Sequence, residues 1–152
     1  MKTPKKYTFH FTKGQPPFHE KTKGKPYHPT KRSCAIWFTR LNKFLFSDGL
    51  PPVGRYVFYT NLVVDKNPSW AYYMRGIATD GRSDAEIGFS KVYPNKQAFL
   101  EVFAHELIHH YQAVNGLPMG HGPSFNKWSN KFKKHGLTLA EKYYDNTRQK
   151  ED

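Results

Sequence analysis

The sequence predicts an α+β fold with an N-terminal helix, a three-stranded antiparallel sheet, a long helix and a further C-terminal helix. Two stretches, 31–46 and about 95–115, repeat apolar residues at the helical period. Three segments between them, 55–65, 70–79 and 85–93, are rich in β-branched and aromatic residues. Because short turns join these segments, the pattern favours an antiparallel meander with the helices packed on it.

The first 30 residues predict a basic, mostly disordered arm, because their proline-rich and lysine-rich composition buries too little apolar surface to offset chain entropy. Residues 1–32 hold nine Lys/Arg and one acid, in a chain whose formal net charge is +12. Such an arm favours a DNA or RNA partner, although a solubilising role explains the charge equally well. Aromatic–His pairs recur at 9–10, 18–19 and 27–28, either as base-stacking rings or by chance.

The domain is predicted to span 31–148, and its elements have recognisable ends. The motif SDGLPP at 47–52 ends the first helix, whose apolar face is formed by Ile36, Trp37, Leu41, Phe44 and Leu45. Pro94-Asn95 introduces the long helix, and Asn115-Gly116 closes it. A last helix at 123–135 carries aromatic residues on one face, and the tail from about 138 reads as a short, fraying helix.

Composition predicts a soluble, cytoplasmic protein that is not secreted. Cys34 is the single cysteine, which excludes an internal disulfide framework and fits a reducing compartment. No apolar run is long enough to span a bilayer, so no membrane association is expected. The N-terminus is basic but lacks the apolar stretch of a secretory signal.

The motif His105-Glu106-Leu107-Ile108-His109 lies in the long helix and has the HExxH pattern. Four residues advance a helix by about 6 Å and just over one turn, so both imidazoles project from one face and can share a zinc ion. Glu106 then reaches a water at the metal rather than the metal itself, which is the place of a general base. A helix with surface histidines is the alternative, and the surrounding apolar residues count against it.

A catalytic zinc site needs a third protein ligand, and His121 is the candidate. Its flanking glycines permit a tight path past the metal, and Pro123 suits the first turn of the next helix. Gln112 and Asn115 stand where a metzincin needs glycine and histidine. A thermolysin-like glutamate ligand would have to be Glu141, which sits in a weakly patterned tail.

HELIHHYQ followed by GHGPSF and an aromatic helix resembles the SprT-like family, which includes the Spartan DNA–protein crosslink proteases. AEIGFSKVY resembles the strand that precedes the HExxH helix in that family, and the likeness covers about 33–135. The resemblance implies a zincin-like metallopeptidase fold, with His105, His109 and His121 binding zinc and Glu106 as general base. Many members carry a cysteine-rich zinc ribbon, which this sequence lacks, so nucleic-acid contact would fall to the arm or to lysines between 127 and 134.

Five further residues of the motif region have two interpretations each. His110 points about 100° away from His109, which favours a packed or surface histidine over a ligand. Glu101 either orients an imidazole or is a surface charge, and Gln112 either supports the site or faces water. Tyr111 and Tyr93 are candidate oxyanion donors that spacing does not distinguish.

The sequence therefore predicts a zinc metallopeptidase that hydrolyses peptide bonds, with nucleic-acid-associated proteins as substrates if the arm binds DNA or RNA. Zinc is the usual ion for such a ligand set, although imidazoles suit several divalent ions. The third strand, around Ile87–Ser90, either holds an extended substrate by main-chain pairing or only packs in the sheet. The alternative function is a non-catalytic nucleic-acid-binding protein with a structural metal. A third is a peptidase whose arm only solubilises it.

Overall fold

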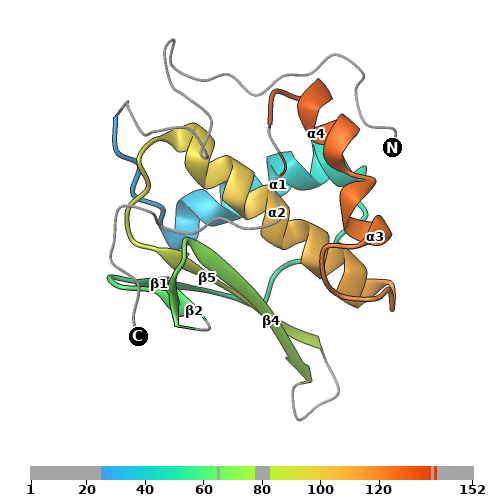
Figure 1. Ribbon diagram of the computed structural model, residues 1–152, viewed down its shortest axis with the longest axis horizontal. Helices are drawn as coiled ribbons and strands as arrows, with labels where there is room; N and C mark the ends of the chain where they lie inside the picture. Colours follow the sequence, from blue (N-terminus) through green and yellow to red (C-terminus); the bar gives the residue numbers. More distant parts are fainter. Residues whose placement is uncertain (1–24, 65, 78–82, 138, 140–152) are drawn as a thin grey trace.

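The computed structural model describes residues 25–64, 66–77, 83–137 and 139. All helices lie on one side of a small sheet, which confirms the α+β class (Figure 1). In chain order the elements are α1 (Lys31–Phe46), β1 (Arg55–Tyr59), β2 (Val63–Val64), β3 (Asn67–Pro68), β4 (Ala71–Ile77), β5 (Ser83–Ser90), α2 (Lys96–Val114), α3 (Pro123–Asn126) and α4 (Ser129–Lys134). Within these described ranges, no helix combines the length and the apolar character that crossing a membrane requires.

Helix α1 has the predicted bounds because both of its ends are capped. Thr30 and Ser33 form a capping box, in which each side chain bonds the other residue's backbone N–H, at 3.0 and 2.8 Å. Ser47 ends the helix in the left-handed conformation. The helix buries Cys34, Leu41 and Leu45 against the core.

The segment before α1 is part of the domain. Tyr27 pairs with Tyr93 through two backbone hydrogen bonds of 2.9 and 2.8 Å, and its ring stacks on Phe99 at 5.0 Å. Its hydroxyl accepts a hydrogen bond from Trp37 Nε1 at 3.0 Å. The end of the predicted arm, at Tyr27, therefore packs against the domain. Residues 1–24 lie outside the described part of the chain.

The predicted antiparallel meander is wrong, because the sheet is mixed and its strand order is β1-β5-β4. Strands β4 and β5 form an antiparallel hairpin, whereas β1 runs parallel to β5 from the Arg55–Glu86 pair to the Tyr59–Ser90 pair. The predicted first strand, 55–65, breaks after Tyr59, and the short β2–β3 hairpin follows before β4. This intervening chain takes β4 to the far side of β5, so the third strand becomes the central one.

Strand β5 presents different residues to its two faces. Ile87 and Phe89 are fully buried, and Phe89 packs on Phe99 and Phe103 of α2, at ring distances of 5.2 and 5.1 Å. On the opposite face, the Glu86 carboxylate accepts hydrogen bonds from Arg55 Nε, at 2.7 Å, and from the Tyr72 hydroxyl. The sheet therefore places its apolar side under α2.

Helix α2 lies at the centre of the molecule (Figure 1). Asn95 is its N-cap, and the side chain of this residue accepts a hydrogen bond from Ala98 N at 2.7 Å. The helix therefore starts close to the predicted position. Fourteen of its 19 residues are buried, and they include polar ones. Because buried polar groups are costly without partners, each must bond internally or serve a ligand.

The chain after α2 turns back along it. The predicted helix at 123–135 is present but divided into α3 and α4. At the division, Trp128 N donates to the carbonyl of Phe125, three residues earlier, at 3.2 Å, as in a 3₁₀ turn. Phe125 and Phe132 are fully buried. The tail predicted from about 138 lies almost wholly outside the described residues.

Candidate metal centre

His105 and His109 lie one turn apart on α2 and point to the same side. Their Nε2 atoms are 3.2 Å apart, and their ring centroids 4.9 Å. His105 is 5% exposed and His109 is half-buried, so neither is a solvated surface histidine. The helical spacing read from the sequence therefore gives the expected geometry.

His121 comes to the same place from the loop between α2 and α3. Its ring centroid is 5.3 Å from that of His105 and 5.1 Å from that of His109. The candidate ligand atoms of the three residues lie within 4.8 Å of one another. Phe125 forms an apolar wall that all three rings contact, at 4.9, 5.5 and 4.7 Å between centroids.

The three imidazoles fit a zinc ion. Two nitrogens bound at 2.1 Å in a tetrahedral site are about 3.4 Å apart, close to the distance between His105 and His109 Nε2. Bringing in the third nitrogen needs only a small shift of its ring, since all lie within 4.8 Å. Burial lowers the pKa of His109, which favours the neutral ring that a metal ligand requires.

Glu106 lies beside this cluster in a closed environment. Its Oε2 is 3.7 Å from His105 Nε2, and the residue is 6% exposed. Burial raises the pKa of Glu106 to about 8 in the absence of a metal ion. A carboxyl with such a pKa exchanges its proton near neutral pH, and a nearby cation would favour its ionised form.

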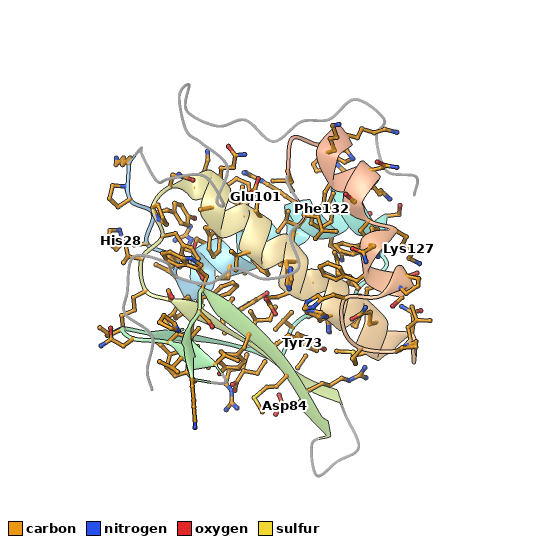
Figure 2. All side chains as sticks on the ribbon, viewed as in Figure 1. His28, Tyr73, Asp84, Glu101, Lys127 and Phe132 are labelled. Atoms are coloured by element: carbon orange, nitrogen blue, oxygen red, sulfur yellow. The ribbon has the colours of Figure 1, made fainter. Side chains whose placement is uncertain are left out.

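His110 joins three parts of the fold and is a packed histidine, the interpretation that spacing favoured. It is 1% exposed, and its Nε2 donates a hydrogen bond to the Pro51 carbonyl at 2.9 Å. Its Nδ1 therefore accepts from the Tyr73 hydroxyl, at 2.8 Å. Tyr73 belongs to β4, and its side chain reaches His110 on α2 (Figure 2). The group of candidate metal ligands in the described chain does not include it.

The other residues of the region are placed as follows. Glu101 is fully buried and accepts a hydrogen bond from Gln97 Nε2 at 3.1 Å, so it is not a surface charge. The Tyr93 hydroxyl donates to the Trp70 carbonyl inside the core, which removes it from the candidate oxyanion donors. Tyr111 packs its ring on Trp128 at 5.1 Å, away from the histidines.

Gln112 and Ser124 make contacts that the sequence did not specify. Gln112 is fully buried and hydrogen-bonds His109, whereas spacing left open whether it faces water. Ser124 hydrogen-bonds Gln112 at 3.0 Å, and no sequence pattern pointed to it. The only available signal was its place beside His121, in the motif GHGPSF.

Of the two alternatives for Ile87–Ser90, the structure supports packing within the sheet and not substrate pairing. These residues belong to β5, which pairs with β1 on one side and β4 on the other. A strand paired on both sides has no backbone groups free for strand addition. The strands at the ends of this sheet are β1 and β4.

In a comparison with protein families, the SprT-like family model matches residues 36–150. The match spans most of the chain, and it includes α2, the loop carrying His121 and both following helices. Searches of curated proteins and of solved structures gave no significant match.

Proposed function

Because the chain belongs to the SprT-like family, we propose that it is a zinc-dependent endopeptidase acting on proteins associated with nucleic acid. The observation that carries this proposal is the convergence of His105, His109 and His121 beside the buried carboxyl of Glu106. Three protein ligands leave one position of a tetrahedral ion open, as in catalytic zinc sites.

The roles follow from the positions of the side chains. The three histidines would hold the ion through ring nitrogens, and a bound Zn²⁺ would supply Lewis acidity to water and to the substrate carbonyl. Glu106 takes a proton from the attacking water at a carboxylate oxygen and passes it to the leaving amine nitrogen. Burial raises the pKa of Glu106 in the metal-free protein, and a bound cation would favour the carboxylate form that accepts the proton.

Glu106→Gln tests this function directly. The variant keeps the three histidines, so we expect unchanged zinc content by elemental analysis. Without a proton acceptor, cleavage of a denatured protein substrate should fall by about 10² to 10⁴-fold. His121→Ala should lose both zinc and cleavage, whereas His28→Ala, an exposed histidine outside the cluster, should keep both. Wild-type cleavage by Glu106→Gln would contradict the proposal.

The charge distribution supports the nucleic-acid part of the proposal. Helices α1 and α4 carry seven Lys/Arg and no acid. In the described chain the only exposed acids are Asp48 and Asp84, since Glu86, Glu101 and Glu106 are buried. A surface of this kind attracts phosphate backbones.

A group of lysines lies at the end of α3 and on α4: Lys127, Lys131, Lys133 and Lys134. Lys127 stands over Tyr111 and Trp128, at 5.2 and 5.6 Å, and Figure 2 shows it on the outer side of α3. Lys131 stands over the same tryptophan at 5.5 Å, and burial, then the charge of Lys134, lower its pKa. A bound phosphate would relieve this crowding of cations.

The same surface favours a second candidate function, a non-catalytic nucleic-acid-binding protein whose metal stabilises the fold. In that case Glu106→Gln would leave every function intact, because no proton transfer is needed. The cleavage assay above therefore separates the two candidates.

A further inference from the structure

We propose that Gln112 is the positioning residue that assembles the metal site, fixing the tautomer of His109 and the loop carrying His121 at once. The proposal rests on the proposed metal-binding function. Gln112 is fully buried on α2, three residues after His109. Its amide oxygen lies 2.8 Å from His109 Nδ1, and its amide nitrogen bonds Gly120 O and Ser124 Oγ at 3.1 and 3.0 Å.

The direction of these hydrogen bonds is forced by chemistry. The Gly120 carbonyl can only accept, so the amide nitrogen of Gln112 must face it. The amide oxygen then faces His109 and must accept, so the proton of the neutral imidazole sits on Nδ1. The Nε2 lone pair of His109 is thereby directed at His105 Nε2, 3.2 Å away, where the ion would lie.

Gln112 also organises the loop from both its side chain and its backbone. Its carbonyl accepts from Leu117 N at 2.9 Å, and its side chain bonds Gly120, next to His121. Gly120 has φ +123°, a conformation that favours glycine, so the loop takes this path without strain. Ser124, the other partner of the amide nitrogen, donates in turn to Pro118 O at 3.2 Å.

One amide therefore links the second ligand to the neighbour of the third. This side-chain bridge acts together with the backbone bond from Leu117 N to Gln112 O and with the bond from Asn126 Nδ2 to His121 O, at 2.7 Å. A role limited to filling space would require only the volume of the side chain. A positioning role requires both hydrogen-bonding ends of the amide.

Three variants of the full chain separate these possibilities. Gln112→Met keeps the shape and removes both ends of the amide. Gln112→Glu keeps an acceptor for His109 Nδ1 but sets it against the Gly120 carbonyl. Ser124→Ala removes one loop contact and leaves the contact with His109 in place.

Metal affinity is measured by Zn²⁺ competition with a chromophoric chelator. We expect a loss of about 10 to 100-fold in Gln112→Met, the usual effect of removing a group that orients a ligand. The metal-free proteins are examined by ¹⁵N NMR of the imidazoles and by amide exchange of residues 117–122. Gln112→Met should lose the Nδ1–H preference of His109, whereas Gln112→Glu should keep it and exchange faster in the loop. Ser124→Ala should keep the tautomer.

Several results would overturn the proposal. One is a Gln112→Met protein with wild-type tautomer and an affinity within twofold of wild type. If Gln112→Met does not fold, the test falls to Gln112→Glu. Amide exchange of residues 117–122 at the wild-type rate in that variant would also overturn the proposal. Failure of the wild-type chain to bind Zn²⁺ would instead overturn the proposed function, and the metal-free measurements would still decide the role of Gln112.

Discussion

Glu106 is a carboxyl held in an apolar setting next to three imidazoles, and its ionisation couples the site to the stability of the whole protein. Its pKa of about 8 lies above the ordinary value of 4.5, because burial penalises the charged form. A carboxyl of this kind favours the folded state while it is protonated, at pH values below its unfolded pKa. The advantage is lost as pH rises towards the folded pKa.

We therefore expect metal-free protein to lose stability between about pH 5 and pH 8 through this group, by up to about 1.4 kcal/mol per pH unit. Glu106→Gln lacks the titration, and its urea-unfolding free energy should fall less over the same range. The difference between the two proteins isolates Glu106 from His109 and His110, whose pKa values are lowered by burial and act in the opposite direction. Parallel pH profiles for the two chelator-treated proteins would contradict the expectation.

The sequence predicted that His105, His109 and His121 would come together, and the structure brings them together, but the sequence did not predict the contacts that support them. His105 and His109 follow from helical periodicity alone, because four residues make about one turn. His121 could be selected from its glycine-flanked setting after α2. Gln112 could not be assigned in this way, because its partners Gly120 and Ser124 reach it only when the loop folds back.

At the scale of elements, His110 joins α2 to β4 by a hydrogen bond. This imidazole lies between the Pro51 carbonyl and the Tyr73 hydroxyl, so one side chain links α2 to the end strand β4 and to the loop after α1. Burial leaves no water to replace a lost partner.

Tyr73→Phe should destabilise the protein by about 1–3 kcal/mol, because the buried Nδ1 of His110 then lacks its donor. Urea unfolding measures the loss. Tyr111→Phe is the matched control, since its hydroxyl makes no hydrogen bond within the described chain, and it should change stability by less than about 0.5 kcal/mol. Equal effects of the two substitutions would show that His110 does not need the tyrosine hydroxyl.

The packing of the sheet also requires a glycine at position 88, in the middle of β5. A Cβ atom at this position would lie 2.0 Å from the ring of Tyr72, so the aromatic side chain packs directly over the glycine. The Tyr72 hydroxyl donates to Glu86, and its oxygen lies 2.8 Å from the hydroxyl oxygen of Tyr59. A side chain at 88 would therefore disturb the outer face of all three strands.

We expect Gly88→Ala to cost about 1–3 kcal/mol, as overpacking does when neither neighbour can move freely. Thermal unfolding compared with Gly122→Ala provides the test, because a Cβ at Gly122 would meet nothing within 4 Å. The control should remain within about 0.5 kcal/mol of wild type. A Gly88→Ala protein as stable as the control would mean that Tyr72 adopts another position at little cost.

The bounds of helices could be predicted from the sequence where neighbouring residues determine them. Capping residues and turn motifs placed α1 and α2 to within one residue of their bounds. The order of strands was wrong, because the turn at 80–83 correctly predicts that β4 and β5 are neighbours but says nothing about which of them β1 joins. That choice depends on contacts between residues such as Arg55 and Glu86, which are distant in the chain.

At the scale of the whole molecule, positive charge dominates the surface. Helices α1 and α4 carry seven Lys/Arg, and nine Lys/Arg fall within residues 1–32, two of which belong to α1. A polyanion could therefore bind through the domain, through the N-terminal residues or through both. These possibilities differ in their dependence on salt.

We expect affinity for single-stranded DNA to fall linearly with log salt concentration, and the double variant Lys131→Glu, Lys134→Glu to flatten that slope by roughly 0.7 for each lysine. Deleting residues 1–24 tests the arm while leaving the Tyr27 anchor in place. Lys91→Glu, an exposed lysine that follows β5, controls for net charge. Unchanged slopes in both the deletion and the double variant would favour a peptidase that makes no use of nucleic acid.

The parallel pairing of β1 with β5 also bears on how the protein folds. Strands β4 and β5 meet across one short connection, whereas pairing Arg55 with Glu86 must close a long stretch of chain and lose its conformational freedom. Contacts so distant along the chain are gained late and slowly. We expect the hairpin to serve as the template on α2, with the strand that is synthesised first being the last to join the sheet.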